Sequence, residues 1–237
     1  MNKMIIGLTV GIFGAWQAAS AADIVGVITF KGTPPPEYTN NLIMQDPTCG
    51  QMYSSPPTTH FYVVGQKGEL ADVLVSLKDA NGKNITGQST GPSQPAALLD
   101  QKGCLYTPQI LAIQTGQKLL VRNSDQCVHN VHTVSTVGNP EHNEAQLPGG
   151  PDLNFTFPKP EMFMTFKCDI HPWMFAWVSI FDNPYFSTSG KDGKFIIKNV
   201  PPGKYTLEAD HRKLGAQTAE IEVKDSDVTQ NFTFEVK

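Results

Sequence analysis

At residues 166–174 the chain reads FKCDIHPWM, and this short stretch brings three soft metal donors together. Cys168 offers a thiolate, His171 an imidazole and Met174 a thioether. A strand that delivers Cys168 and a tight loop behind it would return the other two side chains to the same point. Soft sulfur ligands combined with imidazole suit copper far better than calcium or magnesium. The segment therefore predicts a copper site in which two histidines and a cysteine lie in one plane and a methionine binds weakly along the axis.

The second histidine has to come from elsewhere in the chain, and His129 is the best candidate. It lies far enough before Cys168 for two or three strands to intervene, so the two loops can meet at one end of a sandwich. Asn130 is expected to tie these loops together by hydrogen bonds, as residues behind metal ligands commonly do. Positions three apart on an extended strand face opposite sides. His132 is therefore expected beside the metal rather than as a ligand unless the strand bends.

Short β-branched runs separated by glycine and proline recur through the chain. The 18 prolines and 20 glycines favour many turns and short strands over long helices. Strands at this spacing predict an all-β protein built from sandwiches. The clearest runs are residues 24–30, 73–77, 110–114, 194–197 and 204–207.

Several short motifs before the thiolate loop resemble the first half of a cupredoxin. They are YTP at 106–108, QTG at 114–116, NSD at 123–125 and HNV at 129–131. The Cys-x2-His-x2-Met loop that follows resembles the ligand loop of amicyanin-like cupredoxins. Either half alone would be a weak signal, but the combination is specific.

The resemblance implies a Greek-key cupredoxin sandwich over residues 98–182. By similarity, His129, Cys168, His171 and Met174 are the ligands of one copper ion that cycles between Cu(I) and Cu(II). Proteins of this kind are electron carriers rather than enzymes, and no catalytic constellation is evident elsewhere in the chain.

A second module is indicated by DGKF at 192–195 and PPGKYTL at 201–207. These motifs resemble the carboxypeptidase-regulatory-like, transthyretin-like sandwich. Residues 183–237 alone are thin for a stable sandwich. We therefore expect residues 22–82 to supply its opening strands, with the cupredoxin sandwich nested inside it. The plainer alternative is a long cupredoxin over residues 22–182 followed by a small tail domain.

The run from Cys168 to Met174 and FDNPYF at 181–186 also resemble exported bacterial proteins of the methylamine-utilisation type. That label is a loose one. We do not infer methylamine as a substrate from it.

The four cysteines are not expected to share one role. If Cys168 binds metal, three remain, and we favour a disulfide between Cys49 and Cys104. Closing a loop of this length contributes on the order of 4 kcal/mol in the chain-entropy model. Cys127 would then be a free thiol on the same side of its strand as His129. Bridges from Cys127 to either partner remain open alternatives.

Residues 1–21 are typical of a cleaved signal peptide, with a basic start, an apolar run and ASA at 19–21. The mature protein is then expected in the periplasm with no membrane span, where disulfides can form. The net charge of −4 argues against a nucleic-acid partner.

The sequence thus predicts an electron carrier that docks transiently with redox proteins through an exposed patch near His171 and Trp173. A periplasmic copper chaperone or store is the alternative, and a non-redox binding module is a third possibility. His211, in DHRKLG at 210–215, is either a surface histidine in a basic turn or a neighbour of the metal.

Overall fold

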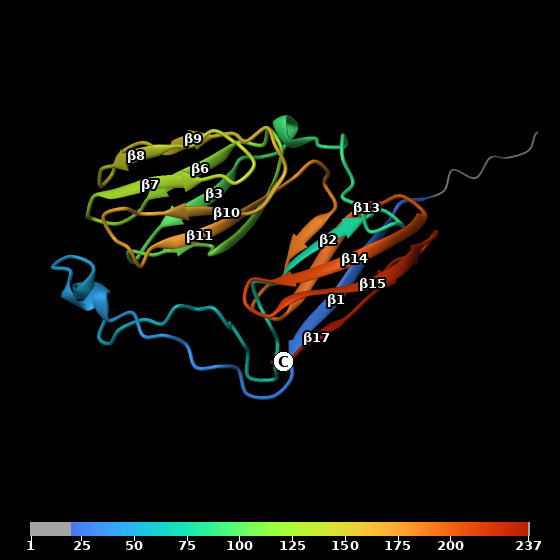
Figure 1. Cartoon of the computed structure of the whole chain (residues 1–237), viewed down its shortest axis with the longest axis horizontal. Coiled ribbons are helices and arrows are strands. Elements are labelled where there is room, and N and C mark those ends of the chain that lie inside the picture. The colour runs from blue at the N-terminus through green and yellow to red at the C-terminus, as the bar shows by residue number, and fades with distance from the viewer. Residues whose placement is uncertain (1–19, 237) are drawn as a thin grey trace, which may run out of the picture.

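The structure is a computed structural model and describes residues 20–236. The sequence-predicted signal peptide, residues 1–21, therefore lies almost entirely outside the described residues. Between residues 20 and 236 no helix is long and apolar enough to cross a membrane. The described chain consists of strands joined by loops and three short 3-10 helices (Figure 1).

Strands from both ends of the chain form one sandwich, here called the terminal sandwich. One sheet has the order β13-β1-β16, with β17 also paired to β1, and the other has the order β12-β2-β14-β15. The strands are β1 (Ala22–Phe30), β2 (Leu74–Lys78), β12 (Phe186–Thr188), β13 (Lys194–Val200), β14 (Gly203–His211), β15 (Gly215–Val223), β16 (Val228–Thr229) and β17 (Phe232–Phe234).

The strands between them form a second sandwich, here called the central sandwich. Its sheets have the orders β5-β11-β10-β7-β8 and β4-β3-β6-β9. The strands are β3 (Ala97–Gln101), β4 (Tyr106–Thr107), β5 (Ile110–Gln114), β6 (Leu119–Asn123), β7 (His129–Val134), β8 (Asn143–Gln146), β9 (Leu153–Phe155), β10 (Glu161–Lys167) and β11 (Phe175–Phe181). The expected all-β class, built from two β-sandwiches, is confirmed.

Alternating burial explains how these strands form and what they present. Every second residue of β1 is buried, from Ala22 to Phe30, as a strand with one face on a core requires. In β10, Met164 and Phe166 point into the central core, and the same alternation carries Cys168 inward just after the strand ends. Each sandwich has its own apolar core.

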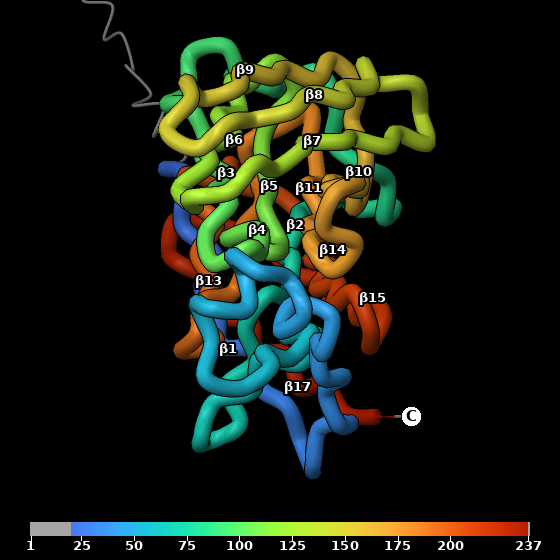
Figure 2. Tube along the Cα trace, turned by 90° about the vertical axis from the view of Figure 1, so that its left-hand side faces the viewer, coloured from blue at the N-terminus to red at the C-terminus, as the bar shows by residue number. Residues whose placement is uncertain are grey.

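A long segment between β1 and β2 runs along the outside of the molecule and connects the two sandwiches. Residues 31–73, here called the strap, leave β1, run to the end of the central sandwich and return to β2 (Figures 1 and 2). The strap carries the 3-10 helices η1 (Asn41–Gln45) and η2 (Gly50–Met52); the third, η3 (Gly91–Ser93), precedes β3. A disulfide between Cys49 and Cys104 fixes the strap to the central sandwich.

The turn between β14 and β15 contacts the central sandwich directly. The Arg212 guanidinium lies 4.9 Å from the ring centre of Trp177 and 5.6 Å from that of Phe163. The Lys213 ammonium lies 3.9 Å from the ring centre of Phe61 in the strap. Cations over aromatic faces are attracted by the ring quadrupole, so this turn helps to hold the sandwiches together.

Candidate metal centre

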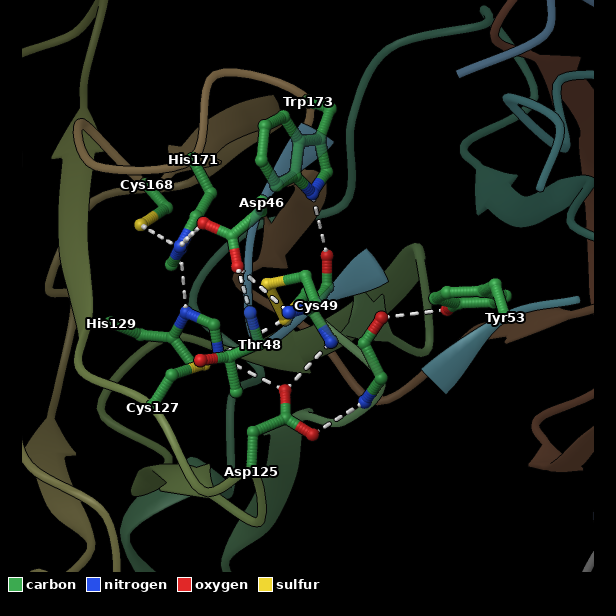
Figure 3. The surroundings of a disulfide bond; sticks show 12 residues. Asp46, Thr48, Cys49, Tyr53, Asp125, Cys127, His129, Cys168, His171 and Trp173 are labelled. Carbon is green, nitrogen blue, oxygen red and sulfur yellow. Dashed lines mark hydrogen bonds and ion pairs between the residues drawn. A yellow bond between two sulfur atoms is a disulfide. The ribbon is translucent and has the colours of Figure 1, made fainter. Parts of the chain in front are cut away.

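Three of the predicted donors meet at one end of the central sandwich, where β7 begins and β10 ends (Figure 3). The Nδ1 atoms of His129 and His171 are 3.0 Å apart, and Cys168 Sγ is 3.7 Å from His171 Nδ1. The side chains of all three are buried, with exposed fractions of 0%, 1% and 4% for His129, Cys168 and His171. The sequence placed these groups on different loops, and the fold brings them together.

Main-chain hydrogen bonds shape the loop that carries the thiolate. The N–H of Cys168 donates to the carbonyl of Met174 at 3.2 Å, and the N–H of Met174 donates to the carbonyl of His171 at 2.9 Å. These bonds fold the segment back on itself, so that its two ends lie together. Met174 is fully buried in the same core as Cys168.

Asn130 links the two loops by hydrogen bonds. Its N–H donates to Cys168 Sγ at 3.4 Å, and its side-chain oxygen accepts the N–H of Asp169 at 2.8 Å. A backbone donor aimed at sulfur stabilises the thiolate form over the thiol. Asn130 therefore positions the cysteine and favours its ligand state.

Asp125, which belongs to the NSD motif at 123–125 but received no role from the sequence, orients His129. The Nε2 of His129 lies 2.9 Å from Asp125 Oδ2, and the same carboxylate accepts the N–H groups of Gly103 and Cys104 at 2.6 and 2.7 Å. A carboxylate on one ring nitrogen keeps the proton there, which leaves the lone pair on Nδ1. That lone pair faces the Nδ1 of His171.

This donor set fits a single metal ion. Two imidazole nitrogens at 3.0 Å can share only one proton, whereas one cation between them satisfies both lone pairs. Nitrogen and sulfur ligands lie about 2.0–2.3 Å from a bound transition metal. Ligands at those distances are separated by gaps like the 3.0 and 3.7 Å seen here. Buried thiolate and imidazole donors select a soft transition metal such as copper.

The protonation tendencies of Cys168 and His171 agree with this role, whereas a bound metal would have to compete with a proton at His129. Burial alone would raise the pKa of Cys168, but hydrogen bonds from His129 and the Asn130 N–H outweigh it, and the pKa is lowered. Burial opposes charge on His129 as well, yet Asp125 and Cys168 raise its pKa overall. Burial and the neighbouring His129 charge lower the pKa of His171. The thiolate and a neutral His171 are the forms that bind metal.

The strap covers the metal end of the sandwich, which the sequence did not predict. Asp46, just after η1, places a carboxylate oxygen 3.6 Å from His171 Nε2 and accepts the N–H groups of Thr48 and Cys49 (Figure 3). His171 is consequently only 4% exposed, and the expected bare histidine edge is absent from the described surface. Asp-Pro-Thr-Cys at 46–49 was the available signal, since an Asp before a turn commonly caps it.

His132 lies beside the site and faces away from the donors. It stands opposite Lys167 in the β7–β10 pairing, and its Nδ1 is 2.6 Å from Asp169 Oδ2. Residue 131 on the same strand is buried and His132 is half-buried, in keeping with strand alternation.

His211 is buried in the terminal sandwich, which corrects both readings of it, the surface histidine and the neighbour of the metal. It is 2% exposed, stacks on Tyr62 at 5.8 Å and lies 6.1 Å from the ring of Phe234. Its Nδ1 accepts the N–H groups of Lys213 and Leu214. Pairing of β14 with β2 and β15 draws His211 into the terminal sandwich, and only the turn after it reaches the central one.

Cys127 is a free, half-buried thiol next to the disulfide. Its Sγ lies 3.7 Å from Cys104 Sγ and 3.6 Å from His129 Nε2, the nitrogen on the far side of the ring from Cys168. Burial and the Asp125 carboxylate raise the pKa of Cys127 to about 11. It is therefore protonated at neutral pH and a poor nucleophile toward the neighbouring disulfide.

A family model described as the β-sandwich domain of ER membrane protein complex subunit 7 matches residues 176–236. This is a different β-sandwich family from the carboxypeptidase-regulatory-like one that the motifs at 192–207 resembled. The match begins in β11 of the central sandwich and continues through the C-terminal strands of the terminal sandwich, well under half of the chain. No curated protein sequence matches this chain.

Among solved structures, the chain resembles a Cu-containing nitrite reductase from Thermus scotoductus SA-01 at 19% identity and a TM-score of 0.35. That alignment covers 44% of this chain and 27% of the reductase, so the chain spans about a quarter of its length. A purple cupredoxin from Nitrosopumilus maritimus aligns at 21% identity over 35% of this chain and 98% of its own, with a TM-score of 0.31. An amicyanin mutant in its Cu(I) form aligns at 20% identity over 46% and 98%, with a TM-score of 0.33. Likenesses this distant assign no role to this chain.

Proposed function

We propose that this protein binds one copper ion through His129, Cys168 and His171, with Met174 as a weak axial ligand, and carries electrons. The observation that supports this most is a buried set of soft donors held close together by the chain itself. Sites whose ligands are already in place change valence with little reorganisation. A bound copper ion would supply one-electron chemistry by cycling between Cu(I) and Cu(II).

The surrounding residues would hold the ligands in place. Asp125 fixes the ring of His129, and the N–H of Asn130 favours the thiolate of Cys168. Asp46 and the strap exclude water from His171. A dry, ordered environment limits solvent rearrangement when the charge of the site changes.

Trp173 is the aromatic group that leads from this site toward the surface. Its ring centre lies 5.2 Å from that of His171, its side chain is half-buried, and its Nε1–H donates to the Cys104 carbonyl at 3.1 Å. Because Asp46 covers the imidazole edge, we propose that a redox protein docks over Trp173.

The residues also support a cellular context. The signal-like residues 1–21 favour export to the periplasm, where the Cys49–Cys104 disulfide would persist. We further propose that residues 22–82 and 183–237 form one domain with the cupredoxin-like residues 98–182 inserted. Separate cores and the pairing of β1 with β13 and β17 support this division.

Copper handling is the second candidate, and Cys127 is the observation that favours it. A chaperone or store needs exchangeable soft ligands, and a free thiol lies 3.6 Å from the ring of His129. A non-redox binding module has in its favour only the family match to residues 176–236.

Addition of Cu(II) to the purified protein separates these possibilities. An intense visible thiolate-to-copper band that ascorbate bleaches and reoxidation restores is expected for the electron carrier. A colourless protein that retains Cu(I) would instead indicate copper handling, and a protein that binds no copper would leave only the binding module. Met174→Leu should keep the band and raise the reduction potential if the methionine is an axial ligand.

A further inference from the structure

Three sulfur atoms gather beside the proposed copper ligands, and the electron-carrier role uses none of them. Cys49 and Cys104 form the disulfide, and Cys127 Sγ is 3.7 Å from Cys104 Sγ (Figure 3). Cys127 Sγ also lies within 4.8 Å of Cys49 Sγ. The three residues come from the strap, from the loop after β3 and from the loop before β7. Once the disulfide is opened, these three sulfurs form a candidate ligand set.

We propose that the reduced protein binds a second ion, Cu(I), through the thiolates of Cys49, Cys104 and Cys127. A dithiol reductant first opens the disulfide: it gives two electrons and two protons to Cys49 and Cys104 and becomes a disulfide itself. Cu(I) then displaces the protons from the three thiols and forms three copper–sulfur bonds. The copper ion keeps its oxidation state throughout.

The donor set selects Cu(I) over zinc. Zinc in proteins takes four ligands, whereas three soft thiolates suffice for Cu(I). The polar side chains nearby, Asp125, His129 and His171, are already engaged, and His171 faces His129 through Nδ1 and Asp46 through Nε2. Asp125 accepts hydrogen bonds from Gly103, Cys104 and the ring of His129. The other nitrogen of His129 faces His171.

The disulfide and the metal ion would be alternative cross-links for the strap, because both need the sulfurs of Cys49 and Cys104. Each would join the strap to the central sandwich beside Asp46, which covers His171. An ion that binds only the reduced form stabilises that form by mass action. By the same linkage, oxidation to the disulfide expels the ion. The half-buried Cys127 gives Cu(I) access from solvent.

Anaerobic Cu(I) titration of the full chain against the chelator bathocuproine disulfonate tests this inference. The disulfide-intact protein should withdraw one equivalent of Cu(I) from the chelator, and the reduced protein two. Reduced Cys127→Ser should withdraw one, because the second set then has two thiolates. Reduced Cys168→Ser should lose the first equivalent and keep the second, so failure of the electron-carrier site is distinguishable from failure of this one.

The double variant Cys49→Ser/Cys104→Ser gives an independent arm without a reductant. It should withdraw one equivalent, and far-UV circular dichroism should match the disulfide-intact protein. A reduced wild type that withdraws no more Cu(I) than the disulfide-intact protein would overturn the proposal. So would a reduced Cys127→Ser or a double variant that still withdraws two.

Discussion

Each sandwich buries a histidine near a strand end, but the two imidazole rings have different partners. His129 of the central sandwich has one nitrogen held by Asp125 and the other facing His171 Nδ1 at 3.0 Å. His211 of the terminal sandwich uses its Nδ1 to accept the N–H groups of Lys213 and Leu214. Burial is almost identical, at 0% and 2% exposure. What distinguishes the candidate ligand from the core residue is therefore an uncommitted lone pair that faces other donors.

The largest effect should come from the thiolate beside His129. Cys168→Ser should abolish the visible charge-transfer band of the Cu(II) protein, because only a thiolate produces it. Two control variants should keep the band. His211→Asn changes the terminal sandwich, and Cys127→Ser changes the Nε2 side of the His129 ring. Absorption spectra of the three variants at equal copper loading check this, and a band in Cys168→Ser would break the comparison.

The next effect concerns the pH dependence of stability. Burial lowers the pKa of His211 to about 4, although the carboxylate of Glu37 opposes the shift. The unfolded chain therefore takes up the proton first, near pH 6.5, while the folded chain stays neutral until about pH 4. The contribution of neutral His211 to stability is fully present above about pH 6.5. It is lost as the pH falls from about 6.5 to 4, which lowers the free energy of unfolding by about 3 kcal/mol in total.

Urea unfolding of wild type and His211→Asn between pH 7.5 and 4 measures that contribution. Asparagine can still accept the N–H groups of Lys213 and Leu214 but does not titrate. The difference in unfolding free energy between the two proteins should shrink as the pH falls. Parallel curves would show that His211 has the same pKa in the folded and unfolded chains and would remove the contrast with His129.

A smaller effect is expected from the carboxylate that orients His129. Asp125→Asn should lower copper affinity by about 10–100-fold, because an amide no longer fixes the proton on Nε2. Asp46→Asn is the matched control. Asp46 Oδ2 lies 3.6 Å from His171 Nε2, whereas Asp125 Oδ2 lies 2.9 Å from His129 Nε2. Competition with a chelator ranks the two. Equal losses would mean that the two carboxylates act only through charge.

The smallest effect should be at the contact between the sandwiches. Arg212→Ala removes the cation over Trp177, 4.9 Å from its ring centre, and should cost about 0.5–1 kcal/mol of unfolding free energy. Lys224→Ala, an exposed cation paired only with Glu222 in the described chain, should cost less. Thermal unfolding of the two variants tests this. Equal changes in Tm would mean that the turn contributes nothing to the contact between the sandwiches.

The sequence could predict the parts of the site that depend on local chemistry. Cys168, His171 and Met174 share one loop, and strand alternation sets the inward direction of His129 and the outward direction of His132. It could not predict contacts made by loops far away along the chain. Asp46 reaches His171 only because the strap crosses the outside of the molecule. His211 was misplaced because residue spacing does not say how one sandwich faces another.

The interleaved topology has a consequence for the order of folding. The strand pairs of the central sandwich lie within residues 97–181, so it can form as soon as that segment is available. β1, by contrast, pairs with β13, β16 and β17, which come last in the chain. Pairings of such long sequence separation form slowly. Until the end of the chain is available, the backbone edges of the first strand stay unpaired, and this is the stage of folding most prone to aggregation.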